Sequence, residues 1–208
     1  MNIKEKSKMI IGVDIDGVVA DRLAWRFTFT KDYFAKRGIE LVDRTVYYVE
    51  DAFNISREQG HEYWKNSSTD YARYVAPISG AKETLDRLKK DGHTIIINTA
   101  RWYSERNDEV GEHMRNAVKE WLVKHEIPYD ELVFSSFGNK DKLEVVNKYN
   151  IDIHIDDYER EIYLIAPHKP VIIFEQPYNK NLTDIPNTHR AHNWDDVYSI
   201  ISRLSSTV

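Results

Sequence analysis

Cysteine is missing from this chain of 208 residues, which excludes a disulfide framework and metal sites built from thiolates. Also missing is any run that approaches the roughly 18 apolar residues of a membrane span. No apolar stretch of signal-peptide length precedes the first predicted strand. We therefore expect a cytoplasmic protein that does not enter a membrane.

The chain also lacks an excess of positive charge. Its 29 Lys and Arg residues face 34 Asp and Glu residues, for a formal net charge of -5. This balance argues against a nucleic-acid polymer held on a broad basic surface, but it allows a small phosphorylated substrate in a locally positive site. A Walker phosphate loop, a glycine-rich dinucleotide turn and a Ser-His-Asp triad are absent as well, and the 8 histidines show no metal-ligand spacing.

What the sequence does have is an apolar run at residues 9–13 that leads into Asp14, Asp16 and Gly17. The pattern predicts a buried strand that stops at a sharp turn, with two carboxylates at its carboxyl end. In an open α/β sheet this end is where ligands bind. Because the two acids are two positions apart, we expect them to lie close together and to require a hard cation such as Mg2+. On this motif alone, an acidic turn after an edge strand is an equally good interpretation.

The rest of the chain alternates between helical and extended patterns. A helix is predicted over 21–38, and another from Ser56, which forms a capping box with Gln59, to about Val75. Residues 39–55 are ambiguous, since 45–49 has strand propensity among acidic residues. We further predict strands at 93–98, 131–135, 151–155 and 170–174, and helices at 77–92, 104–124, 140–149, 159–166 and 194–204. This order indicates an α/β fold, a Rossmann-like and mostly parallel sheet with helices on both faces.

Residues 22–77 break the alternation, because they contain helical patterns but no convincing core strand. They are therefore predicted to form an insertion after the first strand. The insertion holds more aromatic rings than a unit of its size needs for its own core, so we expect some to face the active site, where a planar wall would suit a nucleobase. For any single ring, packing within the insertion is the better interpretation. The rings are Trp25, Phe27, Phe29, Tyr33, Phe34, Tyr47, Tyr48, Phe53, Tyr63, Trp64, Tyr71 and Tyr74.

A hydroxyl and an arginine follow the strand predicted at 93–98. Thr99 stands at its carboxyl end, where a hydroxyl and the next backbone N–H group, that of Ala100, can hold phosphate oxygens without adding charge. The alternative is that Thr99 caps the following turn. Arg101 could bind a phosphate or another substrate group with its planar fork, or it could form a surface ion pair with Glu105.

A lysine and a second acidic pair lie further along the chain. Asp156 and Asp157 end the strand predicted at 151–155, and Lys142 stands at the start of the helix before it. Lys140 is the rival lysine. We prefer Lys142 because the Asp-Lys pair and the spacing of 14 residues to Asp156 resemble the lysine motif of the haloacid dehalogenase superfamily, whereas Lys140 is more easily a solvated side chain.

Taken in order, four of these stretches resemble the motifs of the haloacid dehalogenase (HAD) superfamily of phosphotransferases. They are Asp14-Ile15-Asp16-Gly17, Thr99, Lys142 and Asp156-Asp157. The insertion, the run Asp-Gly-Val-Val-Ala-Asp and the run Thr-Ala-Arg look most like the 5'(3')-deoxyribonucleotidase-type and related nucleotidase branch. The resemblance implies a core of residues 9–21 and 78–208 and a helical cap of residues 22–77.

The resemblance also implies a role for each site residue. Asp14 would be the nucleophile that forms an aspartyl-phosphate, and Asp16 the acid that protonates the leaving group and then activates water. Phosphate would be held by Thr99, Ala100, Arg101 and Lys142. The Mg2+ shell would consist of Asp14, the main-chain carbonyl of Asp16 and Asp156, with Asp157 orienting water or a neighbouring group.

The expected function is a Mg2+-dependent phosphomonoester hydrolase that acts on nucleoside 5'(3')-monophosphates. Two alternatives stay open: the same site acting on a sugar phosphate or another small metabolite, with transfer to water or to another acceptor, and a non-catalytic binding protein with this fold. Dehalogenase chemistry is disfavoured, because that branch does not keep an aspartate at the position of Asp16. The sequence leaves the oligomeric state open, and a homodimer is one option.

Overall fold

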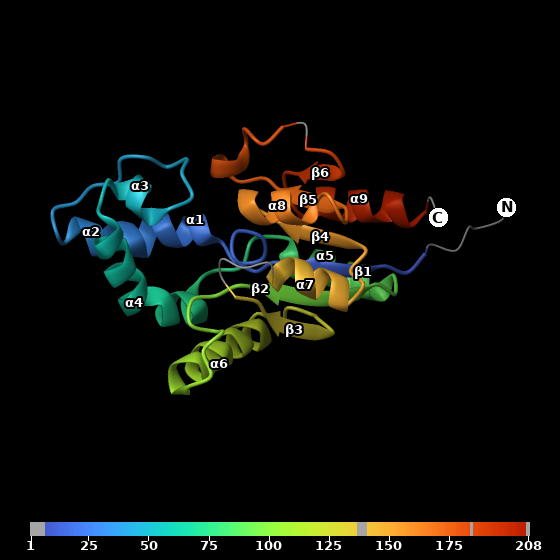
Figure 1. Cartoon of the computed structure of the whole chain (residues 1–208), viewed down its shortest axis with the longest axis horizontal. Coiled ribbons are helices and arrows are strands. Elements are labelled where there is room, and N and C mark those ends of the chain that lie inside the picture. The colour runs from blue at the N-terminus through green and yellow to red at the C-terminus, as the bar shows by residue number, and fades with distance from the viewer. Residues whose placement is uncertain (1–6, 137–140, 184, 207–208) are drawn as a thin grey trace.

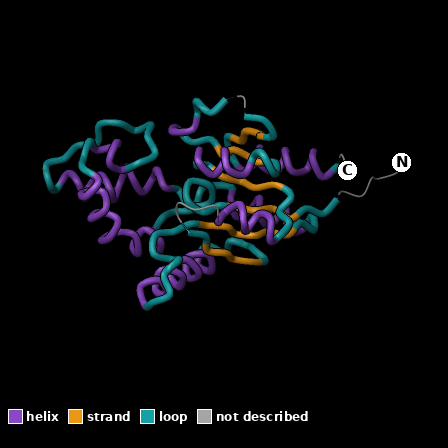
Figure 2. The backbone as a smooth tube through the Cα atoms, in the orientation of Figure 1, coloured by secondary structure: helices purple, strands orange, loops and turns teal. Residues whose placement is uncertain are grey.

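The computed structural model describes residues 7–136, 141–183 and 185–206. Within these residues six strands form one sheet in the order β3-β2-β1-β4-β5-β6, and every neighbouring pair is parallel (Figures 1 and 2). The strands are β1 Ile10–Val13, β2 Thr94–Thr99, β3 Glu131–Phe134, β4 Ile153–Asp156, β5 Val171–Phe174 and β6 Thr188–Ala191. The predicted α/β fold is therefore confirmed, with a sheet that is parallel throughout.

Helices cover both faces of this sheet, because its strands bury side chains on both sides. In β2, Ile95 and Ile97 belong to one core cluster, whereas Ile96 between them belongs to another. The first cluster is covered by α5 (Ala81–Lys90), α6 (Glu109–Lys124) and α9 (Trp194–Ser205), and the second by α7 (Asp141–Lys148) and α8 (Glu159–Ile165). The strands consequently appear in the sequence as continuous apolar runs.

The inserted segment folds into helices that lie to one side of the sheet, at the left of Figure 1. They are α1 Arg22–Trp25, the π-helical turn η1 Arg26–Thr30, α2 Lys31–Ala35, α3 Val49–Phe53 and α4 Arg57–Tyr74. Phe34, Phe53 and Tyr63 are buried against one another in a small core of the segment's own. The chain enters and leaves the segment side by side, since the N–H of Asp21 donates to the carbonyl of Ala76 at 2.7 Å.

Helix α4 confirms the capping box predicted at its start. The hydroxyl of Ser56 accepts a hydrogen bond from Gln59 N, and the side chain of Gln59 accepts one from Ser56 N. Two backbone N–H groups that the helix itself cannot satisfy thus find partners.

Two local features differ from the predictions, and a third settles a stretch that the sequence left ambiguous. The helix predicted over 104–124 begins only at Glu109, because the side chain of Asp108 accepts a hydrogen bond from Gly111 N and caps the helix there. Residues 45–49 form no strand, and Val49 instead begins α3. Strand β6 was not predicted, because Thr-His-Arg-Ala is not an apolar run. It lies at the edge of the sheet, where it pairs with β5.

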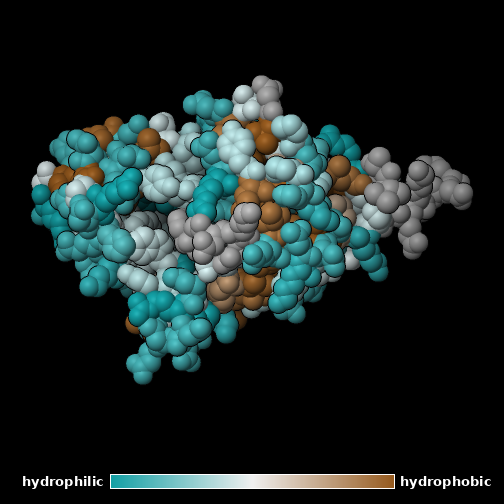
Figure 3. Space-filling view, in the orientation of Figure 1, coloured by the Kyte–Doolittle hydropathy of each residue, from teal (hydrophilic) through white to brown (hydrophobic). Residues whose placement is uncertain are grey.

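The molecular surface shown in Figure 3 is mostly hydrophilic, and hydrophobic atoms appear on that face in separate small patches. No helix within the described ranges is both long and apolar enough to span a bilayer. The large apolar side chains are instead concentrated in the two clusters against the sheet and the small core of the inserted segment.

Ser56→Ala should lower the free energy of unfolding by about 1 kcal/mol, because it removes the acceptor for Gln59 N that begins α4. Urea unfolding followed by circular dichroism measures the change. Ser199→Ala is the matched control, since that exposed hydroxyl donates only to the carbonyl of Asp195 within α9. An equal loss in both variants would contradict the capping role.

Candidate active site

The carboxyl ends of three neighbouring strands bring the predicted site residues together. β1 is hydrogen bonded to β2 on one side and to β4 on the other. Asp14 directly follows β1, Thr99 ends β2 and Asp156 ends β4. Because these strands are parallel and in register, the three side chains meet at the sheet edge where ligands bind in open α/β folds.

Asp14, Asp156 and Asp157 form a buried acidic cluster. One carboxylate oxygen of each lies within 4.8 Å of the others, and none of the side chains is more than slightly exposed. An all-oxygen set of this kind matches the preference of a hard divalent cation. Asp157 was expected only to orient water or a neighbour, yet its carboxylate joins the cluster, whereas that of Asp16 does not.

Lys142 lies between two members of this cluster. Its ammonium nitrogen is 2.9 Å from Asp14 Oδ1 and 2.7 Å from Asp156 Oδ2, and the residue is 4% exposed. Burial lowers the pKa of Lys142, but the two carboxylates outweigh burial and raise it well above its usual value. The lysine is therefore a permanent positive charge inside the site. Its rival Lys140 lies outside the described residues.

Burial acts to raise the pKa of all three acids of the cluster, but the net shift is upward for two of them and downward for the third. Burial raises the pKa of Asp14 to about 7, with Lys142 opposing the shift and Asp156 adding to it. Burial and the negative charges of Asp156 and Asp14 raise the pKa of Asp157 well above its usual range. For Asp156 burial also acts upward, but Lys142 and His154, whose Nε2 lies 3.3 Å away, hold the pKa below its usual range. One lysine thus leaves part of the negative charge unbalanced, which a cation would offset.

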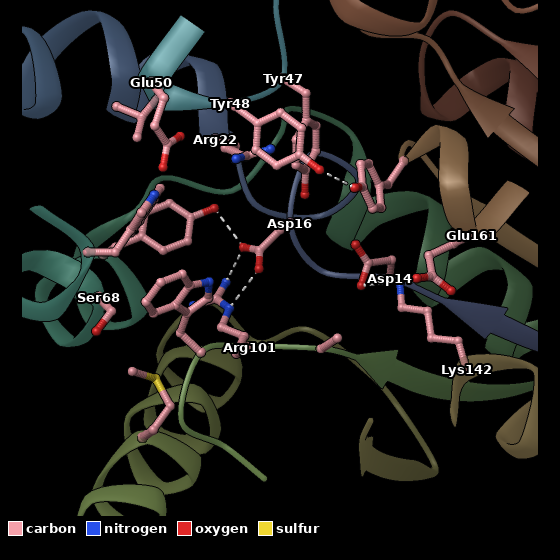
Figure 4. Close-up of a pocket in the computed structure, with 17 residues that line it drawn as sticks. Asp14, Asp16, Arg22, Tyr47, Tyr48, Glu50, Ser68, Arg101, Lys142 and Glu161 are labelled. Atoms are coloured by element: carbon pink, nitrogen blue, oxygen red, sulfur yellow. Dashed lines mark hydrogen bonds and ion pairs between the residues drawn. The ribbon is translucent and has the colours of Figure 1, made fainter. Parts of the chain in front are cut away.

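Asp16 lies beyond the end of β1 and is held by different partners. Arg101 donates to its two carboxylate oxygens, from Nε at 3.1 Å and from an Nη at 2.7 Å, and the hydroxyl of Tyr71 donates to Oδ1 at 2.6 Å (Figure 4). Arg101 is 4% exposed, so the alternative of a surface ion pair with Glu105 is wrong. The strand-alternation argument does not apply past β1, yet Asp14 and Asp16 line the same pocket.

Thr99 presents a buried hydroxyl that has no hydrogen-bond partner among the described residues. The alternative that it caps the following turn is therefore wrong. A buried hydroxyl without a partner carries a free-energy cost, which a bound oxygen acceptor would remove. Ala100, the next residue, lines the pocket directly.

A cavity of about 160 Å³ lies over these groups, between the strand ends and the inserted segment. Its walls include four aromatic rings from that segment, Tyr47, Tyr48, Trp64 and Tyr71. The prediction that some of the segment's rings face the site is thus confirmed, while other rings such as Phe34 pack the segment itself. Tyr158, which also lines the cavity, stacks on Tyr47 with the ring centroids 4.3 Å apart, and its hydroxyl shares a hydrogen bond of 2.6 Å with that of Tyr48.

Sequence reasoning missed the segment that supports Asp157 and the turn after Asp16. The hydroxyl of Tyr178 donates to Asp157 Oδ2, and Gln176 Nε2 donates to the carbonyl of Gly17 at 2.7 Å. Gly17 has a φ of 79°, and a Cβ there would lie 2.0 Å from Asp157 Oδ2. Only glycine allows the turn to approach the acid so closely. These contacts join residues far apart in the chain, so no local sequence pattern predicts them.

Comparison with solved structures identifies the fold of this chain. A HAD family hydrolase from Deinococcus radiodurans, solved with bound phosphate and sodium, superposes with a TM-score of 0.64 at 13% identity, covering 97% of this chain and 98% of its own. A HAD-superfamily hydrolase from Ehrlichia chaffeensis gives a TM-score of 0.55 at 18% identity, with 96% and 98% covered. The fold is therefore that of HAD-like α/β hydrolases.

The family follows from the sequence comparisons. Residues 8–206 match the family described as 5' nucleotidase, deoxy (pyrimidine), cytosolic type C protein. A nucleotidase of Clostridium acetobutylicum is 28% identical over 195 residues, covering 93% of this chain and 94% of the relative. A Chlorobaculum tepidum protein named "Putative 5'(3')-deoxyribonucleotidase" is 26% identical over 202 residues, with 94% and 91% covered. The chain belongs to this nucleotidase family and is an enzyme of the HAD phosphatase type, which confirms the resemblance noted in its motifs.

Replacing Asp14 or Asp156 by Asn should affect stability differently once metal has been removed by chelation. The pKa of Asp14 is raised to about 7, so its ionisation opposes folding, and stability is lost as pH rises from about 4 to about 7. The pKa of Asp156 is lowered, so its charge contributes stability that is present above about pH 4 and lost as pH falls further.

At about pH 8, Asp14→Asn should therefore unfold at the same or a higher temperature than the wild-type protein, and Asp156→Asn at a lower one. Thermal unfolding followed by circular dichroism measures both. The reverse order of the two variants would contradict this charge assignment.

Proposed function

We propose that this protein is a Mg2+-dependent phosphomonoester hydrolase that acts on nucleoside 5'(3')-monophosphates through an aspartyl-phosphate. The observation that carries the proposal is one edge of the sheet with three buried carboxylates, a buried lysine and a buried hydroxyl that lacks a partner among the described residues. Each group meets one need of phosphoryl transfer: a cation site, neutralisation of charge, and binding of phosphoryl oxygens.

Asp14, Asp156 and Asp157 would hold the Mg2+. The resemblance of the motifs implies the main-chain carbonyl of Asp16 as a further ligand. These groups are all oxygen donors, as Mg2+ prefers. When bound, the ion supplies positive charge that offsets the nucleophile and the phosphoryl oxygens.

Asp14 is the nucleophile in this proposal. One of its carboxylate oxygens forms a bond to phosphorus while the bond between phosphorus and the ester oxygen breaks. Lys142, 2.9 Å from Asp14 Oδ1, holds this carboxylate and neutralises charge on the phosphoryl group. The hydroxyl of Thr99 and the N–H of Ala100 donate to the phosphoryl oxygens.

Asp16 serves as the general acid and then as the general base. It gives its proton to the departing ester oxygen in the first step. In the second step it takes a proton from water, while the water oxygen bonds to phosphorus and the bond between phosphorus and Asp14 breaks. Arg101 and Tyr71 orient the Asp16 carboxylate on the pocket wall.

Residues 22–77 act as a cap over the core of residues 9–21 and 78–208, and the cap supplies the substrate's second contact surface. The four rings that it contributes to the pocket suit a nucleobase, because stacking contributes on the order of 1–3 kcal/mol per base. The relatives from Clostridium acetobutylicum and Chlorobaculum tepidum, which are named as nucleotidases, support the same substrate class.

A sugar phosphate or another small metabolite is the second candidate substrate, with water or another acceptor. Glu50 and Ser68 favour it, since both polar side chains lie on the pocket wall and could bind sugar hydroxyls. The same two groups can equally contact the ribose of a nucleotide, so the choice between the candidates depends on the aromatic wall.

Purified protein with Mg2+ should hydrolyse nucleoside monophosphates with a higher kcat/KM than sugar phosphates, measured as phosphate release over a panel of both. Chelation should abolish turnover, and Ca2+ should inhibit because its looser coordination misplaces the attacking carboxylate. Asp14→Asn is the inactive control and should remain folded. Activity that survives exhaustive chelation would contradict the metal site, and a preference for sugar phosphates would favour the second candidate.

Asp16→Asn should damage the hydrolysis of alkyl phosphates far more than that of an activated aryl phosphate, because only a poor leaving group needs its proton. The expected difference is about 10²- to 10⁴-fold in kcat. Steady-state kinetics on a nucleoside monophosphate and on p-nitrophenyl phosphate measure it. Equal damage to both substrates would show that Asp16 is not the acid.

A further inference from the structure

Arg22 is a buried cation of the pocket that the proposed reaction does not use. It opens α1, is 9% exposed and lines the cavity together with Asp14 and Asp16. One terminal guanidinium nitrogen of Arg22 is buried without a hydrogen-bond partner. Such an orphaned donor carries a free-energy cost in the free protein, and a ligand that supplies an acceptor would remove it.

The other cations that line the pocket already contact carboxylates, although one terminal nitrogen of Arg101 is also buried without a hydrogen-bond partner in the described part of the chain. Lys142 contacts Asp14 and Asp156, and Arg101 contacts Asp16. Arg22 has no carboxylate within ion-pair distance among the described residues. Its guanidinium instead lies over the ring of Tyr47, whose centroid is 3.8 Å from the Arg22 guanidinium carbon.

A second arginine increases the demand for an acceptor at Arg22. Arg26 is also buried, and its guanidinium donates to the carbonyls of Val46 and Tyr47, so it holds the loop that carries Tyr47 and Tyr48. Burial and the neighbouring charge of Arg22 lower the pKa of Arg26 to about 10. Two neighbouring buried cations repel each other, and an oxygen acceptor at Arg22 would offset this repulsion.

The position of Arg22 separates it from the group that binds the transferring phosphoryl. In Figure 4 its guanidinium lies beside Tyr47, on the side of Asp16 away from Lys142. The aromatic wall of the pocket lies around it, with Tyr71 and Trp64 as further lining residues. A substrate that places its phosphoryl group at Asp14 would bring its non-reacting part to this end of the pocket.

We propose that Arg22 is a substrate-binding residue whose free guanidinium nitrogen donates to an oxygen acceptor on the non-reacting part of the substrate. The acceptor is the carbonyl oxygen of a nucleobase or an oxygen of a second phosphate on the ribose. The inference rests on the proposed function, since it needs a phosphomonoester bound at Asp14, and it names the group by which the cap distinguishes one nucleotide from another.

Arg22→Met tests the inference in the full-length protein with Mg2+. The probes are uridine 5'-monophosphate, adenosine 5'-monophosphate, whose base has no carbonyl, adenosine 3',5'-bisphosphate, and phenyl phosphate, which has neither acceptor. The matched control is Arg37→Met, because Arg37 is exposed and stacks on the ring of Tyr33 away from the pocket. Arg22→Lys keeps the positive charge and tests whether the planar guanidinium group is needed.

In Arg22→Met the KM of the substrate that bears the acceptor should rise about tenfold more than that of phenyl phosphate, as expected for a lost hydrogen bond to a charged group. If the acceptor is a base carbonyl, uridine 5'-monophosphate shows the loss and adenosine 5'-monophosphate does not. If it is a second phosphate, adenosine 3',5'-bisphosphate shows it. Arg37→Met should match the wild-type protein throughout.

Equal losses on all these substrates would overturn the inference, because they would place Arg22 at the transferring phosphoryl or in the fold. No loss on any of them would overturn it as well. Isothermal titration of the same nucleotides and of inorganic phosphate gives a readout that does not depend on turnover. A wild-type protein that hydrolyses none of the esters refutes the proposed function, whereas nucleotide binding that is weakened relative to phosphate in Arg22→Met would still support the role of Arg22.

Discussion

The ammonium group of Lys142 is the charge on which the rest of the site depends. It lies within 3 Å of both Asp14 and Asp156, and it opposes the effect of burial on the pKa of each carboxylate. The sheet interior sets its position, since the side chain of Asn98 donates to the Lys142 carbonyl at 3.2 Å and accepts a hydrogen bond from Ser135. A polar contact inside the core thereby fixes a charge at the sheet edge.

Asp16 is the point at which the two parts of the molecule meet. Arg101 reaches it from the loop after β2, and Tyr71 reaches it from α4 of the inserted segment. Tyr71 also packs in the main core cluster with Trp25, so the same residue belongs to both parts. A movement of the inserted segment would therefore displace the Asp16 carboxylate before it displaced the acidic cluster.

Much of the fold and part of the site could be predicted from local pattern. Buried parallel strands are continuous apolar runs in the sequence. Asp14 and Asp156 follow or end such runs, so both could be predicted as site residues. The membership of Asp157 in the acidic cluster could not be predicted, because Tyr178 from a distant segment orients its carboxylate. The isolation of Arg22 was also hidden, since an arginine early in a helix usually reaches solvent, and only packing shows that this one does not. An edge strand such as β6 needs no apolar run and leaves no such signal.

The close contacts of the Asp16–Val18 turn give the site an order of assembly. The carbonyl of Gly17 accepts from Gln176, 159 positions later, and that of Val18 accepts from the indole of Trp194, 176 positions later. Contacts of such long sequence separation form late in folding, because their loop-closure entropy must first be overcome. During synthesis Asp16 and Gly17 are therefore translated well before Gln176 and Trp194, whose side chains hold this turn. A nascent chain that ends before Gln176 has the acids Asp14 and Asp16, but it lacks both of the side chains that hold the turn after them.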